Sequence, residues 1–314
     1  MQNLNRTALE SLNLNTADIM QCMEQIMLAQ GRSEAHAAPK SALVPGDGRF
    51  LMTTLSTLNE PPLMAVKAVV VNQDNPLQHQ LPVINGHILL MHSHSGAMLA
   101  VLDGSWITEV RTAAASALAA RYLARPDAGS IAFIGCGAQA RIHLKLFADL
   151  YPLTEIHALG RGAANRDALC EQARALGLKA HVSPDARTAL QAADMVISTL
   201  PITSDTPPFL DARWLRPGAF ISSVDLGIPW MAQGMARFDR IAVNDLATEQ
   251  MEKPMLDMQL VDYDLIGLAA TPGSRRQQAD ECNAFVFRAV PLGDLAVAAL
   301  ALERAQAQGL LTPR

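Results

Sequence analysis

The sequence predicts an α/β protein with two domains: one built on a doubly wound parallel sheet, and a smaller one of mixed α+β structure. The chain has 314 residues, 50% of them hydrophobic, and a single hydrophobic core stops growing at roughly 250–300 residues. From residue 130 onward, continuous apolar runs alternate with helical segments, which is the order of a parallel sheet covered by helices. Before residue 104 the apolar runs are instead separated by turn residues, which favours strands joined by tight turns.

Composition excludes several classes of protein. The net charge is −5, from 30 acidic and 25 basic side chains, so we expect no nucleic-acid or anionic-membrane partner. No apolar run reaches the ~18–20 residues that span a bilayer, and no stretch has the pattern of a signal peptide. The cysteines are scattered without a Cys-x-x-Cys pair, which argues against a disulfide scaffold or zinc knuckle and suits a reducing compartment. We therefore expect a soluble, cytoplasmic protein.

The first part of the chain is expected to begin with one helix over residues 5–30, where apolar side chains recur at helical spacing. An alanine-rich helix over 109–125, ended by Pro126, closes this part. Between the two helices, strands are expected at 50–52, 65–71, 87–91 and 97–102, with turns at Pro61-Pro62, Asn85-Gly86, Ser95-Gly96 and Asp103-Gly104.

The second part is expected to form the doubly wound sheet. Its strands are predicted at 130–134, 155–159, 179–182, 195–199, 219–224 and 240–243, with helices at 141–150, 166–176 and 185–193 between them. A last alanine-rich helix is predicted over 291–308.

A glycine motif follows the first of these strands and opens a helix. Residues 135–140 have the pattern Gly-x-Gly-x-x-Ala, in which Gly135 allows a tight turn and Gly137 lets the backbone approach a pyrophosphate. The free N–H groups of the helix N-terminus favour the same anion. The motif predicts a Rossmann-type dinucleotide site, although a flavodoxin-like glycine turn without a dinucleotide is the alternative. The residues expected at the cofactor are Gly135, Gly137, Ala138, Gln139 and Ala140.

The choice between NAD and NADP depends on the end of the second strand of this domain. An NAD site usually has Asp or Glu there, but residues 157–162 contain no carboxylate. Arg161, helped by Arg166, could pair with a 2′-phosphate. The sequence therefore predicts NADP(H), with NAD(H) possible; the alternative for Arg161 is a solvated arginine in a glycine-rich loop.

The junction between the two parts resembles that of a known family. The run Glu109-Val110-Arg111-Thr112-Ala113-Ala114, ahead of the glycine motif, is similar to the junction of the ornithine cyclodeaminase/μ-crystallin family. That family includes ornithine and lysine cyclodeaminases, ketimine reductases, pyrroline-2-carboxylate reductases and some alanine dehydrogenases. Other matching features, spread over nearly the whole chain, are Val66-Lys67, Leu102-Asp103-Gly104, Ser198-Thr199, Val224-Asp225 and the segment 287–294.

The resemblance implies an architecture and a set of cofactor contacts. It implies a homodimer whose substrate-binding and dimerisation domain comprises residues 1–112, completed by the C-terminal helix at 290–314. Residues 113–289 would then form the Rossmann domain. Thr112 would meet the cofactor phosphates, and Ser198, Thr199 and Val224 would also lie at the cofactor.

The resemblance also implies that Lys67 and Arg111 hold a substrate carboxylate. Independently, a lysine in the apolar run 66–71 is costly to bury without an anionic partner. Arg111 is expected to open a helix, where a cation is unfavourable unless an anion is bound nearby. The alternatives are a lysine that points to solvent from a strand edge and an ordinary surface arginine.

Asp225 is the candidate group for chemistry at nitrogen. It follows an apolar strand, at the carboxyl edge where doubly wound sheets bind ligands. The resemblance implies that it holds an iminium or relays a proton to the product amine. The alternative is a capping or turn aspartate before Gly227.

The chain departs from the family pattern at three places. Lys40 stands where arginine is usual after proline, and it offers charge without a bidentate fork. Phe50 replaces the glutamate that cyclodeaminases carry before the Leu-Met pair, which removes a partner for the distal amine of ornithine. Residues 288–290 lack the serine that is common there, which puts that cofactor contact in doubt.

Together these features predict an NAD(P)H-dependent oxidoreductase of amino-acid metabolism that reduces small α-imino acids, of the ketimine or pyrroline-2-carboxylate type. Its reverse reaction is amino-acid dehydrogenation. Catalytic roles are assigned to Asp225 and Lys67, and substrate binding to Lys40, Lys67 and Arg111. The alternatives are an NAD-dependent ornithine cyclodeaminase that forms proline and a non-catalytic μ-crystallin-like binding protein. We expect no metal, because His92-x-His94 lacks an evident third ligand, and we expect Cys136 to pack against the sheet.

Overall fold

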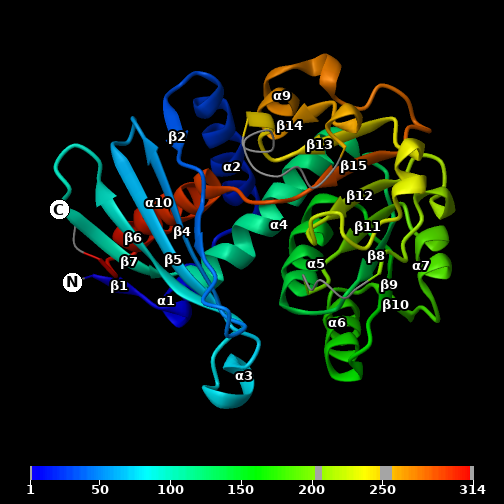
Figure 1. The fold of residues 1–314 in the computed structure, drawn as a ribbon, viewed down its shortest axis with the longest axis horizontal. Coiled ribbons are helices and arrows are strands. Elements are labelled where there is room, and N and C mark those ends of the chain that lie inside the picture. Colours follow the sequence, from blue (N-terminus) through cyan, green and yellow to red (C-terminus); the bar gives the residue numbers. More distant parts are fainter. Residues whose placement is uncertain (1, 202–206, 248–256, 312–314) are drawn as a thin grey trace. The chain divides into compact units, whose positions relative to one another are not determined.

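The computed structural model describes residues 2–201, 207–247 and 257–311. The chain divides into two compact units (Figure 1). Unit 1 comprises Met1–Arg111 together with Val290–Arg314, and unit 2 comprises Thr112–Ala289. Helix α4 (Gly104–Leu123) begins in the first unit and ends in the second. Each unit has a sheet of its own.

Unit 1 is built on a seven-stranded sheet of order β1-β7-β6-β5-β4-β2, with β3 paired to β4. All of its pairs are antiparallel except β1 with β7. Helix α10 (Pro291–Ala307) packs on β4, β5 and β6 and on helix α2 (Thr16–Gly31), so the end of the chain lies against its beginning. The other elements are β1 (Asn3–Leu4), α1 (Arg6–Ser11), β2 (Ala35–Ala37), β3 (Ser41–Leu43), β4 (Phe50–Leu58), β5 (Leu63–Val71), α3 (Asn75–Gln78), β6 (Ile84–His92) and β7 (Met98–Asp103).

The prediction of one helix over residues 5–30 is wrong, because the chain breaks between α1 and α2. Asn13 adopts a positive φ of 50°, which a helix interior does not allow. Asn15 then caps α2 by accepting a hydrogen bond from the Asp18 N–H at 2.8 Å. Two asparagines therefore separate helices whose apolar side chains share one periodic pattern.

The prediction of a turn at Asn85-Gly86 is also wrong, since both residues lie inside β6. A Cβ atom on Gly86 would come within 2.1 Å of the carbonyl oxygen of Ala68, on the neighbouring strand β5. The glycine therefore reflects the close approach of two backbones rather than a reversal of the chain.

Helix α4 begins five residues earlier than predicted, and Asp103-Gly104 is its start rather than a turn between strands. The Asp103 side chain accepts a hydrogen bond from the Trp106 N–H at 2.8 Å, which satisfies one of the free donors of the first turn. Arg111 consequently lies in the helix interior, seven positions after Gly104.

Unit 2 contains an eight-stranded, entirely parallel sheet of order β10-β9-β8-β11-β12-β15-β13-β14. The predicted doubly wound α/β class is therefore confirmed. Its strands are β8 (Ser130–Ile134), β9 (Glu155–Leu159), β10 (Lys179–Val182), β11 (Met195–Ser198), β12 (Phe220–Ser223), β13 (Arg240–Val243), β14 (Tyr263–Asp264) and β15 (Asn283–Val286).

The helices of unit 2 connect these strands. They are α5 (Ala138–Leu150), α6 (Ala163–Ala175), α7 (Ala186–Ala192) and α9 (Leu265–Ala270), with short 3₁₀ turns at Ala212–Trp214, Ala232–Arg237, Met258–Leu260 and Pro272–Ser274. Within the described residues, the sequence prediction missed β15, which lies between β12 and β13 in the sheet.

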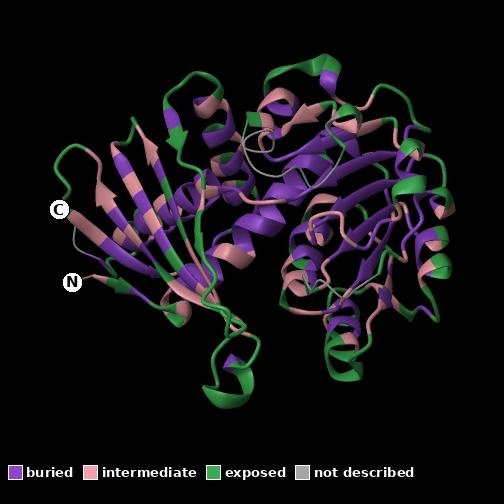
Figure 2. Cartoon of the chain, viewed as in Figure 1, coloured by how far each residue is buried: buried purple, intermediate pink, exposed green. Residues whose placement is uncertain are grey.

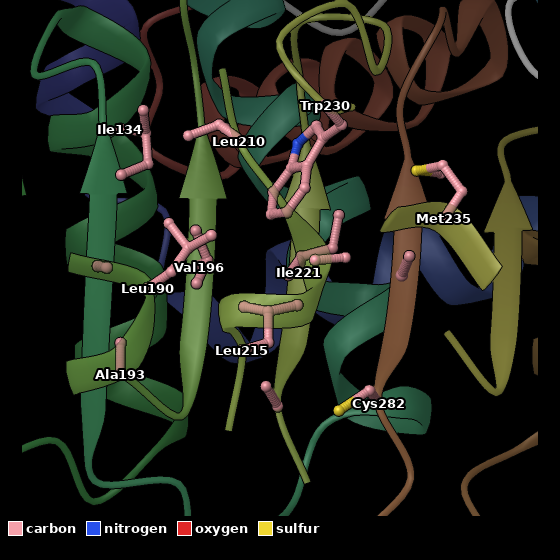
Figure 3. Close-up of a cluster of buried hydrophobic side chains, with 14 of the residues drawn as sticks. Ile134, Leu190, Ala193, Val196, Leu210, Leu215, Ile221, Trp230, Met235 and Cys282 are labelled. Atoms are coloured by element: carbon pink, nitrogen blue, oxygen red, sulfur yellow. The ribbon is translucent and has the colours of Figure 1, made fainter. Parts of the chain in front are cut away.

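The central strands of unit 2 are buried along their whole length (Figure 2). On one side, Ile134, Val196 and Ile221 from three adjacent strands pack with Leu190 of α7 and with Trp230 (Figure 3). Burial of large apolar side chains fixes the strands in register. The carboxyl ends of the strands, where ligands bind in such sheets, are thereby held in place.

Candidate active site

Three charged side chains form a buried cluster in unit 1: Lys67 of β5, Arg111 of α4 and Asp294 of α10. Asp294 Oδ2 lies 2.6 Å from Lys67 Nζ, and Asp294 Oδ1 accepts a hydrogen bond from Arg111 Nε at 3.0 Å. The exposed fractions are 2%, 5% and 1% for Lys67, Arg111 and Asp294. One carboxylate therefore joins two cations that come from different secondary-structure elements.

The strand pattern explains why Lys67 is buried. Leu63, Ala65, Lys67 and Val69 alternate along β5 and are all buried. A lysine in this row points toward the covered face of the sheet, and the alternative of a solvent-pointing lysine is wrong.

Arg111 does not open a helix, so the dipole argument for an anion beside it was wrong. The helix starts earlier because Asp103 caps it, and Arg111 lies in the interior. The alternative of an ordinary surface arginine is also wrong, since the side chain is buried against Asp294.

The pKa of Lys67 is lowered to about 8, mainly because the side chain is buried. The nearby charge of Arg111 also lowers this pKa, whereas Asp294 raises it. Thr108 Oγ1 lies 3.4 Å from the ammonium. At neutral pH the ammonium form still predominates, so these three side chains are two cations and one carboxylate.

Sequence reasoning missed Asp294 as a member of this cluster. Two signals could have found it: the apolar strand around Lys67 requires a buried anion, and Asp294 lies in the first turn of a helix that starts at Pro291. Lys40, which was expected to bind substrate, lies between β2 and β3 and is partly exposed.

In unit 2, Asp225 is buried with an exposed fraction of 2%. Its Oδ1 accepts hydrogen bonds from the hydroxyl groups of Ser198 at 2.8 Å and Ser223 at 2.5 Å, and its Oδ2 accepts from the Leu200 N–H at 3.1 Å. Burial raises the pKa of the Asp225 carboxyl, and the three donors oppose this shift. The carboxylate is thus held rigidly beside the ends of β11 and β12.

The turn interpretation of Asp225 is partly right, because the chain reverses directly after it. Leu226 and Gly227 have φ of +63° and +77°, and the Ile228 N–H bonds to the Asp225 carbonyl at 3.2 Å. A left-handed leucine is strained. This reversal places Asp225 at the carboxyl edge of the sheet.

The glycine motif forms the turn from β8 into α5. Gly135 has φ +93°, and a Cβ there would lie 2.8 Å from the Thr199 carbonyl oxygen, so glycine is required by the fold itself. Gly137 begins α5 without a side-chain cap, and a Cβ there would meet nothing within 4 Å. The loop therefore leaves backbone N–H groups beside open space, which fits a pyrophosphate. Ala140 is buried, Ala138 is exposed, and Gln139 Oε1 is buried with no hydrogen-bond partner among the described residues.

Cys136 lies inside the same turn, where a Cβ on Gly160, directly after β9, would come within 3.0 Å of its Sγ. Its side chain is buried, and burial raises the pKa of the thiol to about 11. A thiol of this kind stays protonated at neutral pH and is not a nucleophile.

A row of buried, hydrogen-bonded side chains fixes the first turn of α5, and sequence reasoning also missed it. His143 Nδ1 lies 2.7 Å from the Gln139 carbonyl oxygen, and its Nε2 lies 3.0 Å from Ser116 Oγ. Ser222 of β12 donates to Ser116 Oγ at 2.8 Å. Burial lowers the pKa of His143 to about 4, so the ring is neutral and links α5, α4 and β12 without adding charge.

The loop that follows β9 carries an exposed arginine and leads into the uncapped N-terminus of α6. Arg161 is exposed, and Gly162 begins α6 without a side-chain cap. Arg166, the expected helper, donates to Asp167 Oδ1 at 3.2 Å from both Nε and Nη2, so an acidic neighbour already engages it.

The remaining predicted residues lie as follows. Thr112 is buried in α4, Ser198 is buried at the end of β11, Thr199 donates to the Gly135 carbonyl at 3.2 Å, and Val224 is partly buried after β12. His92 and His94 lie edge to face, with ring centroids 5.6 Å apart. Over residues 2–201, 207–247 and 257–311, no three His, Cys, Asp or Glu side chains are grouped to hold a metal ion. In the same described part, no helix is long and apolar enough to cross a membrane.

Fold and site together define a two-domain α/β protein with a dinucleotide-type glycine turn and a separate buried ion cluster. Residues 4–243 match the sequence model of the Ornithine cyclodeaminase/mu-crystallin family, and the chain belongs to this family. The resemblance seen in the sequence is thereby confirmed.

Three similar proteins illustrate the relationship. A putative dehydrogenase of Rhizobium meliloti (strain 1021) is 39% identical over 153 residues, 48% of this chain and 45% of that protein. The ketimine reductase mu-crystallin of Rattus norvegicus is 30% identical over 149 residues, 48% of this chain and 46% of that protein. The matched segments thus span about half of these curated relatives. The structure of Thermococcus litoralis Δ1-pyrroline-2-carboxylate reductase in complex with NADH and L-proline has a TM-score of 0.87 at 25% identity, covering 100% of both chains.

Replacing each glycine of the turn by alanine should have a different effect: Gly135→Ala should mainly reduce stability, and Gly137→Ala should mainly reduce cofactor binding. Gly135→Ala should lower the free energy of unfolding by about 1–3 kcal/mol, because it combines a left-handed φ with a backbone clash. Gly137→Ala should cost less than about 1 kcal/mol but weaken dinucleotide binding roughly tenfold or more, since the methyl group would occupy the space a pyrophosphate approaches. Denaturant unfolding and cofactor fluorescence titration measure the two effects. Unchanged dinucleotide affinity in a folded Gly137→Ala protein would contradict the assignment of the loop.

Proposed function

We propose that this protein is an NAD(P)H-dependent reductase of small α-imino carboxylic acids, of the ketimine or pyrroline-2-carboxylate type, whose reverse reaction is amino-acid dehydrogenation. The observation that carries the proposal is the buried cluster of Lys67, Arg111 and Asp294, in which one carboxylate holds an ammonium and a guanidinium close together. Two adjacent cations of this kind are suited to binding a substrate carboxylate. The rat relative is named a ketimine reductase, and the Thermococcus litoralis structure is of a pyrroline-2-carboxylate reductase; both names support the reaction class.

In this mechanism Lys67 and Arg111 bind the substrate carboxylate. Both cations are preorganised and shielded from water, so little reorganisation accompanies binding. The turn at Gly135–Ala140 binds the cofactor pyrophosphate through the N-terminus of α5. When bound, the nicotinamide cofactor supplies the hydride that reduces the imine carbon.

Asp225 acts at the substrate nitrogen. As a carboxylate it stabilises the positive charge of an iminium. Its pKa is raised by burial, so the carboxyl group exchanges a proton with nitrogen closer to neutral pH than an ordinary aspartate does. The hydroxyl groups of Ser198 and Ser223 hold its Oδ1 in position.

The proposal is tested by mixing the purified protein with NADPH and a panel of cyclic and acyclic 2-imino acids. We expect loss of nicotinamide absorbance with at least one imine. Asp225→Asn should lower kcat by about 10²–10⁴-fold, the range typical for removal of a positioned acid–base group, while cofactor affinity stays near that of the wild type.

Two outcomes would overturn this function. One is the absence of turnover with every imine under conditions in which the cofactor binds. The other is ammonia release from ornithine without net change of cofactor, which would identify a cyclodeaminase instead. Phe50, at the start of β4 where cyclodeaminases carry a glutamate, argues against that second result.

We further propose NADP(H) as the preferred cofactor. Arg161 is exposed directly after β9, no carboxylate stands at that strand end, and the N-terminus of α6 is uncapped. A 2′-phosphate there would gain both the guanidinium and the helix dipole.

Arg161→Ala should weaken NADPH binding by about 10–100-fold, the equivalent of one charge-assisted hydrogen bond, and leave NADH binding nearly unchanged. The matched control is Arg174→Ala, in the last turn of the same helix α6, which should affect neither cofactor. An equal loss of both cofactors, or of neither, in Arg161→Ala would refute the preference.

We propose that the protein forms a homodimer through the exposed sheet face of unit 1. Leu55, Val66 and Leu89 are register partners on three adjacent strands, and they lie on the sheet face opposite Lys67. Leu55 is 44% exposed and the other two are only partly buried, so this apolar row is suited to a second copy of the chain. Light scattering should give twice the chain mass of 33.7 kDa; a monomer at micromolar concentration would contradict it.

The cytoplasm remains the proposed location, because all four cysteines are free and three of them are buried.

A further inference from the structure

We propose that Asp294 is a positioning residue of the reaction: it aligns the Lys67 ammonium and the Arg111 guanidinium for the substrate carboxylate and keeps Lys67 in its cationic form. This inference rests on the proposed imine reduction and assigns a role to a group outside the predicted site. Asp294 contacts each cation with a different oxygen, at 2.6 Å and 3.0 Å. It therefore fixes the spacing between a strand residue and a helix residue.

The position of Asp294 is set by the packing of α10. Gly293, beside it, lies so close to α2 that a Cβ there would come within 3.1 Å of the Met23 methyl carbon. The Ser56 hydroxyl donates to the Pro291 carbonyl at 3.2 Å and ties the start of α10 to β4. Arg304, farther along α10, pairs with Asp18 of α2. The C-terminal helix thus carries a carboxylate to the two cations rather than only covering the sheet.

Charge explains why a carboxylate is needed there. Two cations buried side by side repel each other, and burial itself disfavours the ammonium. The groups that face Lys67 are Asp294 from α10 and Arg111 and Thr108 from α4, whereas its register partners on β4 and β6 are the uncharged Thr54 and Ile88. Asp294 is therefore the anion among these neighbours that opposes the fall in the pKa of Lys67.

The consequence for function concerns pH. With Asp294 present, Lys67 loses its proton only as pH rises through about 8, so binding of a carboxylate is retained at neutral pH. Without the Asp294 charge, the pKa of Lys67 falls further, and the lysine is neutral at the pH where the enzyme works. The loss of activity should then be reversed by acid.

The test compares Asp294→Asn with wild type and with Asp18→Asn, which removes the other α10 ion pair. For each protein, kcat/KM for a cyclic 2-imino acid with NADPH is measured between pH 5.5 and 9.5. Comparison between the proteins cancels the titration of the imine itself.

We expect wild type and Asp18→Asn to lose about tenfold in kcat/KM per pH unit above pH ~8. Asp294→Asn should show the same fall at least one pH unit lower, with a loss at pH 8 of about fivefold or more that shrinks to within a few-fold of wild type at pH 5.5. Its NADPH affinity should be unchanged.

Two results would overturn the inference. A loss in Asp294→Asn that is equal at every pH would mean a purely structural role. A gain in carboxylate affinity would mean that Asp294 competes with substrate. If Asp294→Asn does not fold, Asp294→Glu, which keeps the charge, is measured instead. Its kcat/KM must fall with rising pH at the same pH as that of wild type, and a fall at lower pH would refute the role.

The inference remains testable if the proposed function fails. In that case no imine is reduced, and calorimetric titration of wild type and Asp294→Asn with pyrrole-2-carboxylate, a planar non-reducible carboxylate, replaces the kinetic readout. Binding that weakens above pH ~8 in wild type, and at lower pH in the variant, supports the positioning role without any turnover; identical pH dependence in both proteins contradicts it.

Discussion

The burial of Lys67 is the constraint on which the account of this protein depends. A lysine that is 2% exposed in the middle of an apolar strand is unstable as a cation unless an anion accompanies it. Asp294 supplies that anion, and Arg111 then adds a second cation to the same carboxylate. Such a buried group of charges is poorly explained by stability alone, because apolar side chains would pack there at lower cost. This is why the cluster is the candidate site for binding a carboxylate.

In unit 2 the candidate cofactor and catalytic residues lie along one edge of the parallel sheet. Because all of its strands are parallel, their carboxyl ends lie at one edge, where Gly135, Thr199 and Asp225 follow β8, β11 and β12. The Thr199 backbone limits what can stand at Gly135, and Ser198 holds the Asp225 carboxylate. The glycine turn and the acid are therefore coupled through one neighbouring strand, β11.

The sequence was most informative where burial leaves a simple pattern. Strands β8 and β13 have the predicted ends, because short apolar runs between turns are characteristic of a covered parallel sheet. The ends of β9 and β10 are also as predicted, although β10 is largely exposed. Local polar contacts were harder to foresee: the start of α2 at its Asn15 cap and the early start of α4 each involve a single side-chain hydrogen bond. Gly86 resembled a turn residue because sequence alone does not show that a neighbouring backbone approaches it.

For the candidate site, sequence identified the two cations of the cluster but neither their shared carboxylate nor how the three groups lie together. Lys67 and Arg111 were found through the cost of burial and through family resemblance, whereas their shared partner Asp294 comes from the far end of the chain. His143 was missed because its role depends on Ser116 and Ser222, which only the folded chain brings together. Contacts between distant segments carry no periodic signal, and this explains both omissions.

The central claim is that Lys67 binds the carboxylate of a small imino acid, and one measurement tests it most directly. Isothermal titration of wild type and Lys67→Met with pyrrole-2-carboxylate, at pH 7 and with saturating oxidised cofactor, compares the affinities when only the ammonium is removed. We expect Lys67→Met to bind about tenfold or more weakly, the value of one buried charge-assisted interaction. Equal affinity in the two folded proteins would contradict it.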